Sequence, residues 1–338
     1  MRILLLRFSS LGDVILTMPV AQTLMQALPG ATVDLGTKLE YKGLFIPPDP
    51  FGSVLYLDDA GLAPFIRSVN RQQYDIIADL HASLRTMTMM PLLRARTKKR
   101  YRKGSFSRRL LVRTDLRLSS FPSVLQRYLD TFDLSEVPDT PWFSIGSEEK
   151  QRGISILHAA GAHRGRTIGI APGAKWATKK WNMERYVELA HRLEAGSSDV
   201  VFVFGKGDEG DRDTLVRSTG DFKILDIAAS TLRETAYALA SMDVFVSSDT
   251  GLMHLAEAAG TPLVVLFGPT TREFGFFPAG SRSIVIEKKL VCRPCSLHGS
   301  ETCKEGHFRC MEDITVDEVE SAVRKLLGDA RTTGTGVA

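Results

Sequence analysis

The residues of this chain best suited to chemistry stand in one polar turn between two apolar runs, Val244–Val246 and Leu263–Phe267. Asp249 and Thr250 offer side-chain oxygens that cap helix N-termini, and Gly251 removes the Cβ where another group must come close. Because backbone N–H groups at a helix start attract anions and hydroxyls, the turn predicts a site for a phosphate or a ribose. A capped helix without a ligand is the alternative, since Asp and Thr cap helices of any function.

The segments around this turn predict a strand, a helix and a second strand. Both apolar runs are short and rich in β-branched or aromatic residues, which is typical of buried parallel strands. Leu252–Ala259 places apolar residues on one helical face, Gly260 ends that helix, and Pro262 prevents it from resuming. Ligands of open α/β sheets bind at the carboxyl ends of the strands, which is where this turn lies.

Similar apolar runs alternate with helical segments along the chain, at residues 2–8, 31–36, 54–57, 76–80, 167–170, 199–204, 224–227 and 284–286. This alternation predicts an α/β fold with parallel, doubly wound sheets. With 338 residues and 43% hydrophobic content, the chain is long enough for two domains that each have a core.

Two polar side chains in the first half of the chain follow expected strands. Asp13 ends the turn after the strand at 2–8, so we expect it at the carboxyl edge of the sheet, in a cleft; a helix N-cap alone is the alternative. His81 follows the strand at 76–80, and it either orients a substrate or satisfies a loop hydrogen bond.

Three motifs carry a resemblance to a known family. The segment DTGLMHLAEAAGTPLVVLFGPT resembles the nucleotide-sugar signature of glycosyltransferase family 9, the bacterial heptosyltransferases that build the inner core of lipopolysaccharide. An R-x4-G-D-x5-P pattern falls on Arg7, Gly12, Asp13 and Pro19. A P-G-A motif ends at Ala174. The basic residue that the family pattern places after it, two positions before a tryptophan, falls on Lys179.

The resemblance implies the GT-B architecture, in which two Rossmann-like domains with parallel doubly wound sheets face each other across a cleft. Residues 1–148 would bind the acceptor and residues 149–315 the nucleotide-sugar donor. A helix at about 316–327 would pack back on the N-terminal domain, and the Gly- and Thr-rich residues 328–338 would form a disordered tail.

The resemblance also implies a reaction, the transfer of heptose from ADP-heptose to the Kdo or heptose of a phosphorylated lipid A precursor. Asp13 would be the general base on the attacking hydroxyl, and Lys179 would stabilise the leaving diphosphate, without a cofactor or metal ion. A single displacement would invert the anomeric centre. The implied donor-binding residues are Gly12, Ala174, Lys175, Lys179, Ser230, Asp249, Thr250, Gly251 and His254. The implied acceptor-binding residues are Arg7, His81, Arg94, Lys98, Lys99, Arg100 and Arg102.

A basic segment at 94–117 contains eleven Lys or Arg residues and one acid, Asp115, in a chain of net charge +4. Such a segment seeks phosphate, on lipid or on nucleic acid, or forms a solvated surface. It has only two aromatic residues, Tyr101 and Phe106, which counts against base stacking. We therefore expect an anionic membrane surface as the partner and no nucleic acid, with a nucleic-acid-binding protein as an alternative.

The longest apolar runs contain only about six residues, far fewer than a membrane span needs, and no signal peptide is evident. The expected location is therefore the cytoplasm, peripheral on the inner face of the inner membrane. The sequence sets no oligomeric state.

The loop Gly205–Gly210 reads GKGDEG and formally matches a dinucleotide-binding fingerprint, with Asp226 at the spacing of a ribose ligand. An NAD(P)-linked oxidoreductase is therefore an alternative function. Asp208 and Glu209 would repel a pyrophosphate, which disfavours it. The D-x-D sequence at 211–213 resembles a metal site of other transferases, but we expect it on an exposed helix start.

Four cysteines, Cys292, Cys295, Cys303 and Cys310, have the spacing C-x2-C-x7-C-x6-C. Four thiolates can hold a structural zinc ion in a tetrahedron. Unliganded thiols and redox or disulfide chemistry are the other interpretations.

Overall fold

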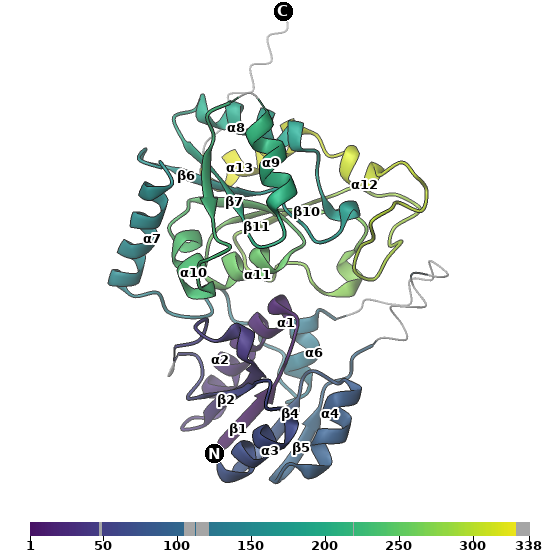
Figure 1. The fold of residues 1–338 in the computed structure, drawn as a ribbon. Helices are drawn as coiled ribbons and strands as arrows, with labels where there is room; N and C mark the ends of the chain where they lie inside the picture. Colours follow the sequence, from purple (N-terminus) through teal and green to yellow (C-terminus); the bar gives the residue numbers. More distant parts are fainter. Residues whose placement is uncertain (47–48, 105–111, 113–121, 219, 329–338) are drawn as a thin grey trace, which may run out of the picture.

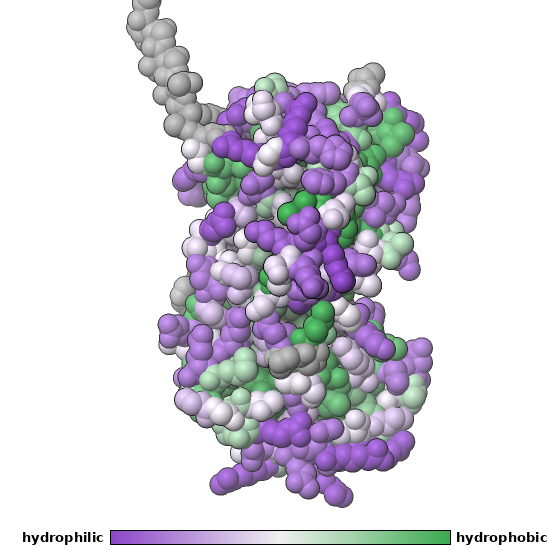
Figure 2. Space-filling view, turned by 90° about the vertical axis from the view of Figure 1, so that its left-hand side faces the viewer, coloured by the Kyte–Doolittle hydropathy of each residue, from purple (hydrophilic) through white to green (hydrophobic). Residues whose placement is uncertain are grey.

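The alternating apolar runs form two separate parallel sheets in a computed structural model of the chain, which describes residues 1–46, 49–104, 112, 122–218 and 220–328 (Figure 1). One sheet belongs to an N-terminal domain and the other to a C-terminal domain. In the space-filling view the molecule narrows between the two domains (Figure 2). Two parallel sheets with helices on their faces confirm the predicted α/β architecture of two Rossmann-like domains.

The N-terminal sheet has the strand order β3-β2-β1-β4-β5, with every neighbouring pair parallel. Its strands are β1 (Arg2–Leu6), β2 (Thr32–Lys38), β3 (Val54–Leu57), β4 (Tyr74–Asp79) and β5 (Ala95–Arg100). Helical segments connect them: α1 (Leu11–Ile15), α2 (Thr17–Ala27), η1 (Leu39–Tyr41), α3 (Leu62–Arg71), α4 (Leu84–Met89), η2 (Met90–Leu92) and α6 (Val124–Asp130). Alternate residues of β1 enter different core clusters on the two faces of the sheet, as the period of two requires.

The C-terminal sheet has the order β11-β10-β9-β6-β7-β8 and is also parallel. Its strands are β6 (Thr167–Ala171), β7 (Asp199–Phe204), β8 (Lys223–Asp226), β9 (Val244–Ser248), β10 (Leu263–Phe267) and β11 (Ser283–Glu287). Its helices are α7 (Ser147–Ala159), η3 (Ala177–Lys179), α8 (Met183–Glu194), α9 (Glu209–Arg217), α10 (Leu232–Ala240), α11 (Gly251–Ala258), η4 (Arg272–Phe274), α12 (Arg309–Glu312) and α13 (Val316–Leu326). Strands β6, β7, β9 and β10 are buried along their whole length, which explains their continuous apolar runs.

The prediction that the last helix returns to the N-terminal domain is wrong. Helix α13 contacts α8 and strands β9, β10 and β11 of the C-terminal domain. Its buried residues Val316, Val319 and Val323 join the core cluster on that face of the sheet. The helix therefore covers apolar surface of its own domain. Residues 329–338, the expected tail, lie outside the described part of the chain.

Helix α7 packs on α10 of the C-terminal domain, so we place the domain boundary before Ser147. Two contacts hold the connecting segment to the C-terminal domain. Trp142 donates its backbone N–H to the carbonyl of Ala258 at 2.8 Å, and its side chain is fully buried. Arg233 of α10 donates to the carbonyl of Ser144 at 2.8 Å. These contacts join the connection to the C-terminal domain.

Candidate active site between the domains

The two polar turns singled out in the sequence face each other across the domains. Helices α1 and α11 begin at these turns and contact each other, and Figure 1 shows α1 directly below α11. A pocket of 230 Å³ lies between them. Its lining residues come from both domains: Ser10, Leu11, Gly12, Asp13, Lys179, Asp249, Thr250, Gly251, His254, Thr270, Phe276, Leu297 and His298.

A larger pocket of 560 Å³ extends over the C-terminal sheet and shares seven lining residues with the first: Ser10, Leu11, Lys179, Asp249, Thr250, Gly251 and His298. Its additional lining residues are Gly173, Ala174, Lys175, Trp176, Gly205, Lys206, Asp208, Ile227 and Leu252. The two pockets together are large enough for a ligand with several groups. They also place Asp13 and Lys179 at one cavity, as the motifs implied.

Asp13 is 9% exposed and forms an ion pair at 2.7 Å between its Oδ2 and the guanidinium of Arg7. The same oxygen accepts hydrogen bonds from Ser10, from Oγ at 2.9 Å and from the backbone N–H at 3.2 Å. Burial raises the pKa of Asp13, but the charge of Arg7 and the bonds from Ser10 outweigh it and hold the pKa below its usual value. Asp13 is therefore ionised at neutral pH.

The other carboxylate oxygen of Asp13, Oδ1, can accept further hydrogen bonds. Its described polar contact is a long one, 3.4 Å from the hydroxyl of Tyr128 on α6. Burial raises the pKa of Tyr128 well above its usual value, so this hydroxyl is a neutral donor. Oδ1 of Asp13 is thus the oxygen that can accept a further proton.

Arg7, an expected acceptor-binding residue, contacts groups of its own domain in this structure. Arg7 is 5% exposed, and its guanidinium donates to the carbonyl of Leu80 at 2.7 Å as well as pairing with Asp13. Its guanidinium carbon also lies 5.8 Å from the centre of the Tyr128 ring. Arg7 lines neither pocket, and its function in this arrangement is to hold the Asp13 carboxylate.

His81 is also set back from the cavity. Its ring packs edge-on against Phe8 with 5.8 Å between ring centres, and its buried Nδ1 has no hydrogen-bond partner among the residues that the structure describes. Burial and the charge of Arg7 lower the pKa of His81 to about 4. The imidazole is therefore neutral at physiological pH, and it lines neither of the two pockets.

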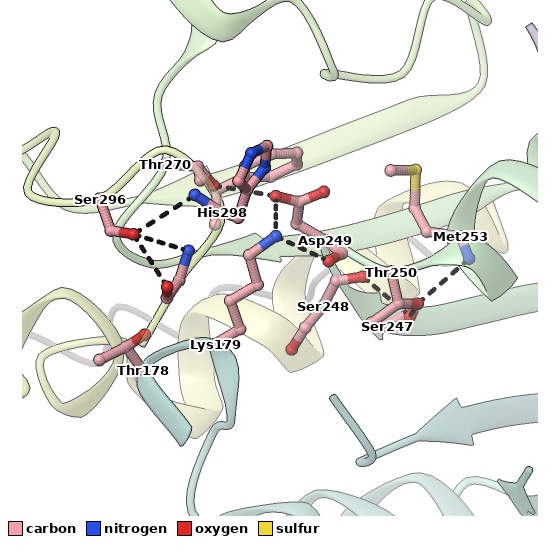
Figure 3. A network of polar contacts seen from close by, with 12 residues as sticks. Thr178, Lys179, Ser247, Ser248, Asp249, Thr250, Met253, Thr270, Ser296 and His298 are labelled. Carbon is pink, nitrogen blue, oxygen red and sulfur yellow. Dashed lines mark hydrogen bonds and ion pairs between the residues drawn. The ribbon is translucent and has the colours of Figure 1, made fainter. Parts of the chain in front are cut away.

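On the C-terminal side, Lys179 and Asp249 form a second ion pair, which is partly buried (Figure 3). The Lys179 ammonium lies 2.6 Å from Oδ2 of Asp249 and 3.2 Å from its carbonyl oxygen. Thr270 donates its hydroxyl to the same Oδ2 at 2.9 Å. Because η3 carries Lys179 and the turn after β9 carries Asp249, the pair joins two loops at the carboxyl edge of the sheet.

Thr250 is the N-cap of α11, and its hydroxyl accepts from the N–H of Met253 at the limit of hydrogen bonding, 3.5 Å (Figure 3). The glycines beside it have a steric role in the domain contact. A Cβ at Gly12 would lie 2.3 Å from Cδ2 of His254, and a Cβ at Gly251 would lie 3.1 Å from Cδ2 of Leu11. The helix starts can approach this closely because both positions lack a side chain.

His254 is 4% exposed and lines the smaller pocket. Its Nδ1 lies 3.6 Å from Oε2 of Glu257, which is beyond hydrogen-bond distance. The other oxygen of Glu257 accepts the backbone N–H of Gly280 at 2.9 Å. Glu257 thus ties α11 to the loop after η4 while facing His254.

Several predicted residues lie at the edge of this site or outside it. Ala174 and Lys175 line the larger pocket, whereas Ser230 is exposed in the loop before α10 and lines neither pocket. Lys180 pairs with Asp211 at 2.8 Å, which accounts for one acid of the D-x-D sequence. Asp226, the expected ribose ligand of a dinucleotide, pairs with Arg212 at 2.8 Å.

Residues 95–100 of the basic segment form β5, an edge strand of the N-terminal sheet. Arg100 reaches the carboxyl edge, 3.6 Å from Asp79, and Lys99 lies 3.4 Å from Asp133. Arg94 directly precedes the amino end of β5, so the segment runs along the whole length of this strand. None of Arg94, Lys98, Lys99, Arg100 and Arg102 lines either pocket. Four further arginines of the basic segment lie outside the described residues: Arg108, Arg109, Arg113 and Arg117.

The four cysteines are close enough to influence one another, but the described residues contain no group of three or more His, Cys, Asp or Glu side chains that could hold a metal ion. Burial, with the neighbouring thiols, raises the pKa of Cys310 to about 11. Cys292 lies 3.9 Å from Nε2 of His307. Among the described residues these contacts do not by themselves form a tetrahedral zinc site.

Sequence reasoning missed Thr270, Phe276, Leu297 and His298 as lining residues. Thr270 ends the family signature, so its hydroxyl was available as a signal. The other three lie in irregular loops after β10 and β11, where no periodicity indicates which side chain faces the cavity.

Two parallel α/β domains with a charged pocket between their carboxyl edges define the architecture of GT-B glycosyltransferases. The chain belongs to glycosyltransferase family 9 (heptosyltransferase), whose model matches residues 62–307. It is 27% identical to lipooligosaccharide heptosyltransferase 2 of Haemophilus ducreyi, over 97% of this chain and 99% of that protein.

Solved structures show the same fold. The ADP-heptose lps heptosyltransferase II of E. coli superposes with a TM-score of 0.76 at 20% identity, over 97% of this chain and 98% of that one. E. coli heptosyltransferase WaaC with ADP-2-deoxy-2-fluoro heptose gives a TM-score of 0.67 at 20% identity, over 96% and 99%. The protein is therefore an enzyme of the glycosyltransferase class, and family membership leaves the oxidoreductase and nucleic-acid alternatives without support.

Proposed function

We propose that the protein transfers a heptose from ADP-heptose to a Kdo or heptose residue of a phosphorylated lipid A precursor, with inversion and without a catalytic metal ion. One observation carries the proposal: Asp13 of the N-terminal domain and Lys179 of the C-terminal domain line a single pocket. A base and a cation on opposite sides of one cavity suit a direct displacement of a diphosphate by a hydroxyl. The heptosyltransferase names of the similar proteins support the sugar and the acceptor class.

The donor fits the C-terminal side of the cavity. The first backbone N–H groups of α11 and the Lys179 ammonium offer positive charge to a diphosphate, and the larger pocket extends past Ala174 and Lys175 toward Ile227 for the nucleoside. Lys179 now pairs with Asp249, so a bound diphosphate must compete with that carboxylate. As the glycosidic bond breaks, the charge on the diphosphate grows and the competition shifts toward the ligand.

The acceptor fits the N-terminal side. Its attacking hydroxyl loses a proton as the new bond forms, and Oδ1 of Asp13 has the capacity to take it. Phosphates of the acceptor find cations at the carboxyl edge of the sheet, where Arg100 and Arg102 are exposed. Among the described residues no helix is long and apolar enough to span a bilayer. We therefore infer that the enzyme meets its lipid substrate from the cytoplasmic side as a peripheral protein.

The proposal is tested with purified protein, ADP-heptose and a panel of truncated acceptors that end in Kdo or in a first heptose. We expect one acceptor to gain a heptose with inverted configuration, measured by mass spectrometry and NMR. Turnover should be unchanged in EDTA, because Lys179 and the start of α11 supply the charge that Mg²⁺ supplies elsewhere. Loss of turnover in EDTA that Mg²⁺ or Mn²⁺ restores would contradict the metal-independent mechanism.

The zinc hypothesis stays a prediction, because the thiol geometry does not form the site by itself. Elemental analysis of freshly purified protein should find about one zinc ion per chain if four thiolates bind it. Iron is measured in the same sample, since four sulfur ligands also suit iron. Active protein that contains neither metal would reject the hypothesis.

Asp13→Asn should lower kcat by about a hundredfold, because an amide keeps the shape of the side chain and loses its basicity. Arg7 would lose its buried partner, so we also expect a lower melting temperature. Activity is therefore measured at a temperature where circular dichroism shows folded protein and ADP still binds. Ser10→Ala is the control, since it removes one hydrogen bond to Oδ2 and keeps the charge. Near-normal turnover of folded Asp13→Asn would move the base elsewhere, with His81 as the next candidate.

The pH dependence follows from the same contacts. The pKa of Asp13 is lower in the folded protein than in the unfolded chain, so its ionised form adds stability above the unfolded value, and this contribution is lost as the pH falls through the folded value. We expect no loss of activity from Asp13 between pH 5 and pH 8, roughly one unit or more above the ordinary Asp value. If His81, with a pKa of about 4, were the base, the same pH profile would be expected. Substitution therefore distinguishes Asp13 from His81 as the base, and a pH profile does not.

Lys179→Ala should lower kcat by a factor on the order of a hundred, the effect of removing one well-placed donor at a developing charge, and weaken ADP binding less. Lys180→Ala is the matched control, because this neighbouring ammonium pairs with Asp211 outside the smaller pocket. Steady-state kinetics and ADP titration separate the two effects. Equal turnover of Lys179→Ala and the unsubstituted protein would remove Lys179 from the mechanism.

A further inference from the structure

Helix α4 has an unusual distribution of side chains for a helix on the surface of a domain. Its buried residues are Thr86 and Met89, whereas Leu84 is 81% exposed and Met87 is 49% exposed. Leu84 and Met87 are three positions apart and therefore lie on one face of the helix. The following turn, η2, adds Leu92 with 61% exposure. Apolar side chains thus point to solvent where polar ones are expected.

Positive charge surrounds these apolar side chains. Residues 80–104 contain eight Lys or Arg and no Asp or Glu. Strand β5 follows η2 and is the edge strand of its sheet, and Lys98 on this strand donates to the carbonyl oxygens of Met90 and Pro91 at 2.8 and 3.4 Å. Arg94 and Arg96 are exposed, and by strand alternation they share the face of Lys98.

We propose that α4, η2 and the first half of β5 form a docking face for an anionic lipid bilayer. We name it the docking face and define it by Leu84, Met87, Leu92, Arg94, Arg96 and Lys98. The proposal rests on the function proposed above, because a lipid-linked acceptor lies in a membrane. It adds the surface that docks and the apolar residues that enter the headgroup region.

An anionic bilayer satisfies both components of the docking face at once. Leu84, Met87 and Leu92 would leave water for the acyl boundary, and the cations would lie at the level of anionic headgroups. A nucleic acid would use the cations but leave the leucines exposed. Tyr101, the aromatic residue of the described basic segment, is 4% exposed and so offers no surface for base stacking.

The position of the docking face agrees with the direction of the site. Helix α4, which carries Leu84 and Met87, begins a few residues after β4 ends at Asp79, and the docking face runs from there along the flank to the start of β5 at the opposite end of the strands. Figure 1 shows α4 and β5 together on one flank of the N-terminal domain. Docking by this flank would hold the acceptor side of the cavity near the bilayer and leave the C-terminal domain free to take donor from solution.

The first experiment is co-sedimentation of the full chain with vesicles. We expect binding to phosphatidylglycerol-containing vesicles, weaker binding as salt is raised, and little binding to pure phosphatidylcholine. The double variant Leu84→Asp, Met87→Asp should reduce the bound fraction at least tenfold. Val216→Asp is the matched control, because Val216 is 63% exposed on α9 of the other domain, and it should bind as the unsubstituted protein does. Unchanged binding of the double variant, or equal binding to both lipids, would overturn the proposal.

A second measurement does not depend on loss of binding. Leu84→Trp should show a blue-shifted emission with anionic vesicles and quenching by brominated lipid, and Val216→Trp should show neither. Absence of both effects at Leu84 would contradict insertion. Transfer of heptose to a water-soluble, deacylated acceptor should be equal in the double variant and the unsubstituted protein. A loss there would place these residues in folding or catalysis, whereas failure of transfer in every variant would concern the proposed function alone.

Discussion

The close contact between the starts of α1 and α11 is the constraint on which the site depends. The imidazole of His254 occupies the space that a side chain at Gly12 would need. Each helix also positions one half of the chemistry, since Asp13 lies in the first turn of α1 and Asp249 directly precedes the cap of α11. A domain rotation that separated the two helices would therefore separate the base from the donor turn. The contact explains why glycine is needed at positions where a ligand alone would not require it.

The charges of the site are balanced separately within each domain. Arg7 neutralises Asp13 in the N-terminal domain, and Asp249 neutralises Lys179 in the C-terminal domain. Asp13 and Lys179 thus each have a partner of opposite charge before substrate arrives, since an unpaired charge at a buried position would be costly. The two pairs differ in what a ligand can do. In the proposed mechanism a diphosphate replaces Asp249 as the partner of Lys179, whereas Asp13 keeps Arg7, which also donates to the carbonyl of Leu80 and lies over the Tyr128 ring.

The sequence predicted the elements and the polar turns well, because both depend on local patterns. Continuous apolar runs identified the buried strands, and Asp and Thr before a glycine identified the start of α11. The destination of α13 could not be predicted, since an amphipathic helix shows that it packs but not against which surface. The ion pair between Arg7 and Asp13 could not be predicted either, because a cation near a cleft looks the same in sequence whether it faces a substrate or an aspartate. The loops that carry Phe276, Leu297 and His298 have no period from which to infer a direction.

The ion pair with Arg7 also constrains the chemistry of Asp13. A carboxylate whose pKa is held below its usual value is a weak base, so it cannot remove the proton of a sugar hydroxyl before attack begins. The hydroxyl becomes acidic only as its oxygen bonds to the anomeric carbon, and a weak base suffices at that stage. The gain is that Asp13 is always ionised and held in one position by Arg7 and Ser10. In the proposed mechanism, the R-x4-G-D spacing therefore specifies an oriented, permanently charged acceptor of a late proton.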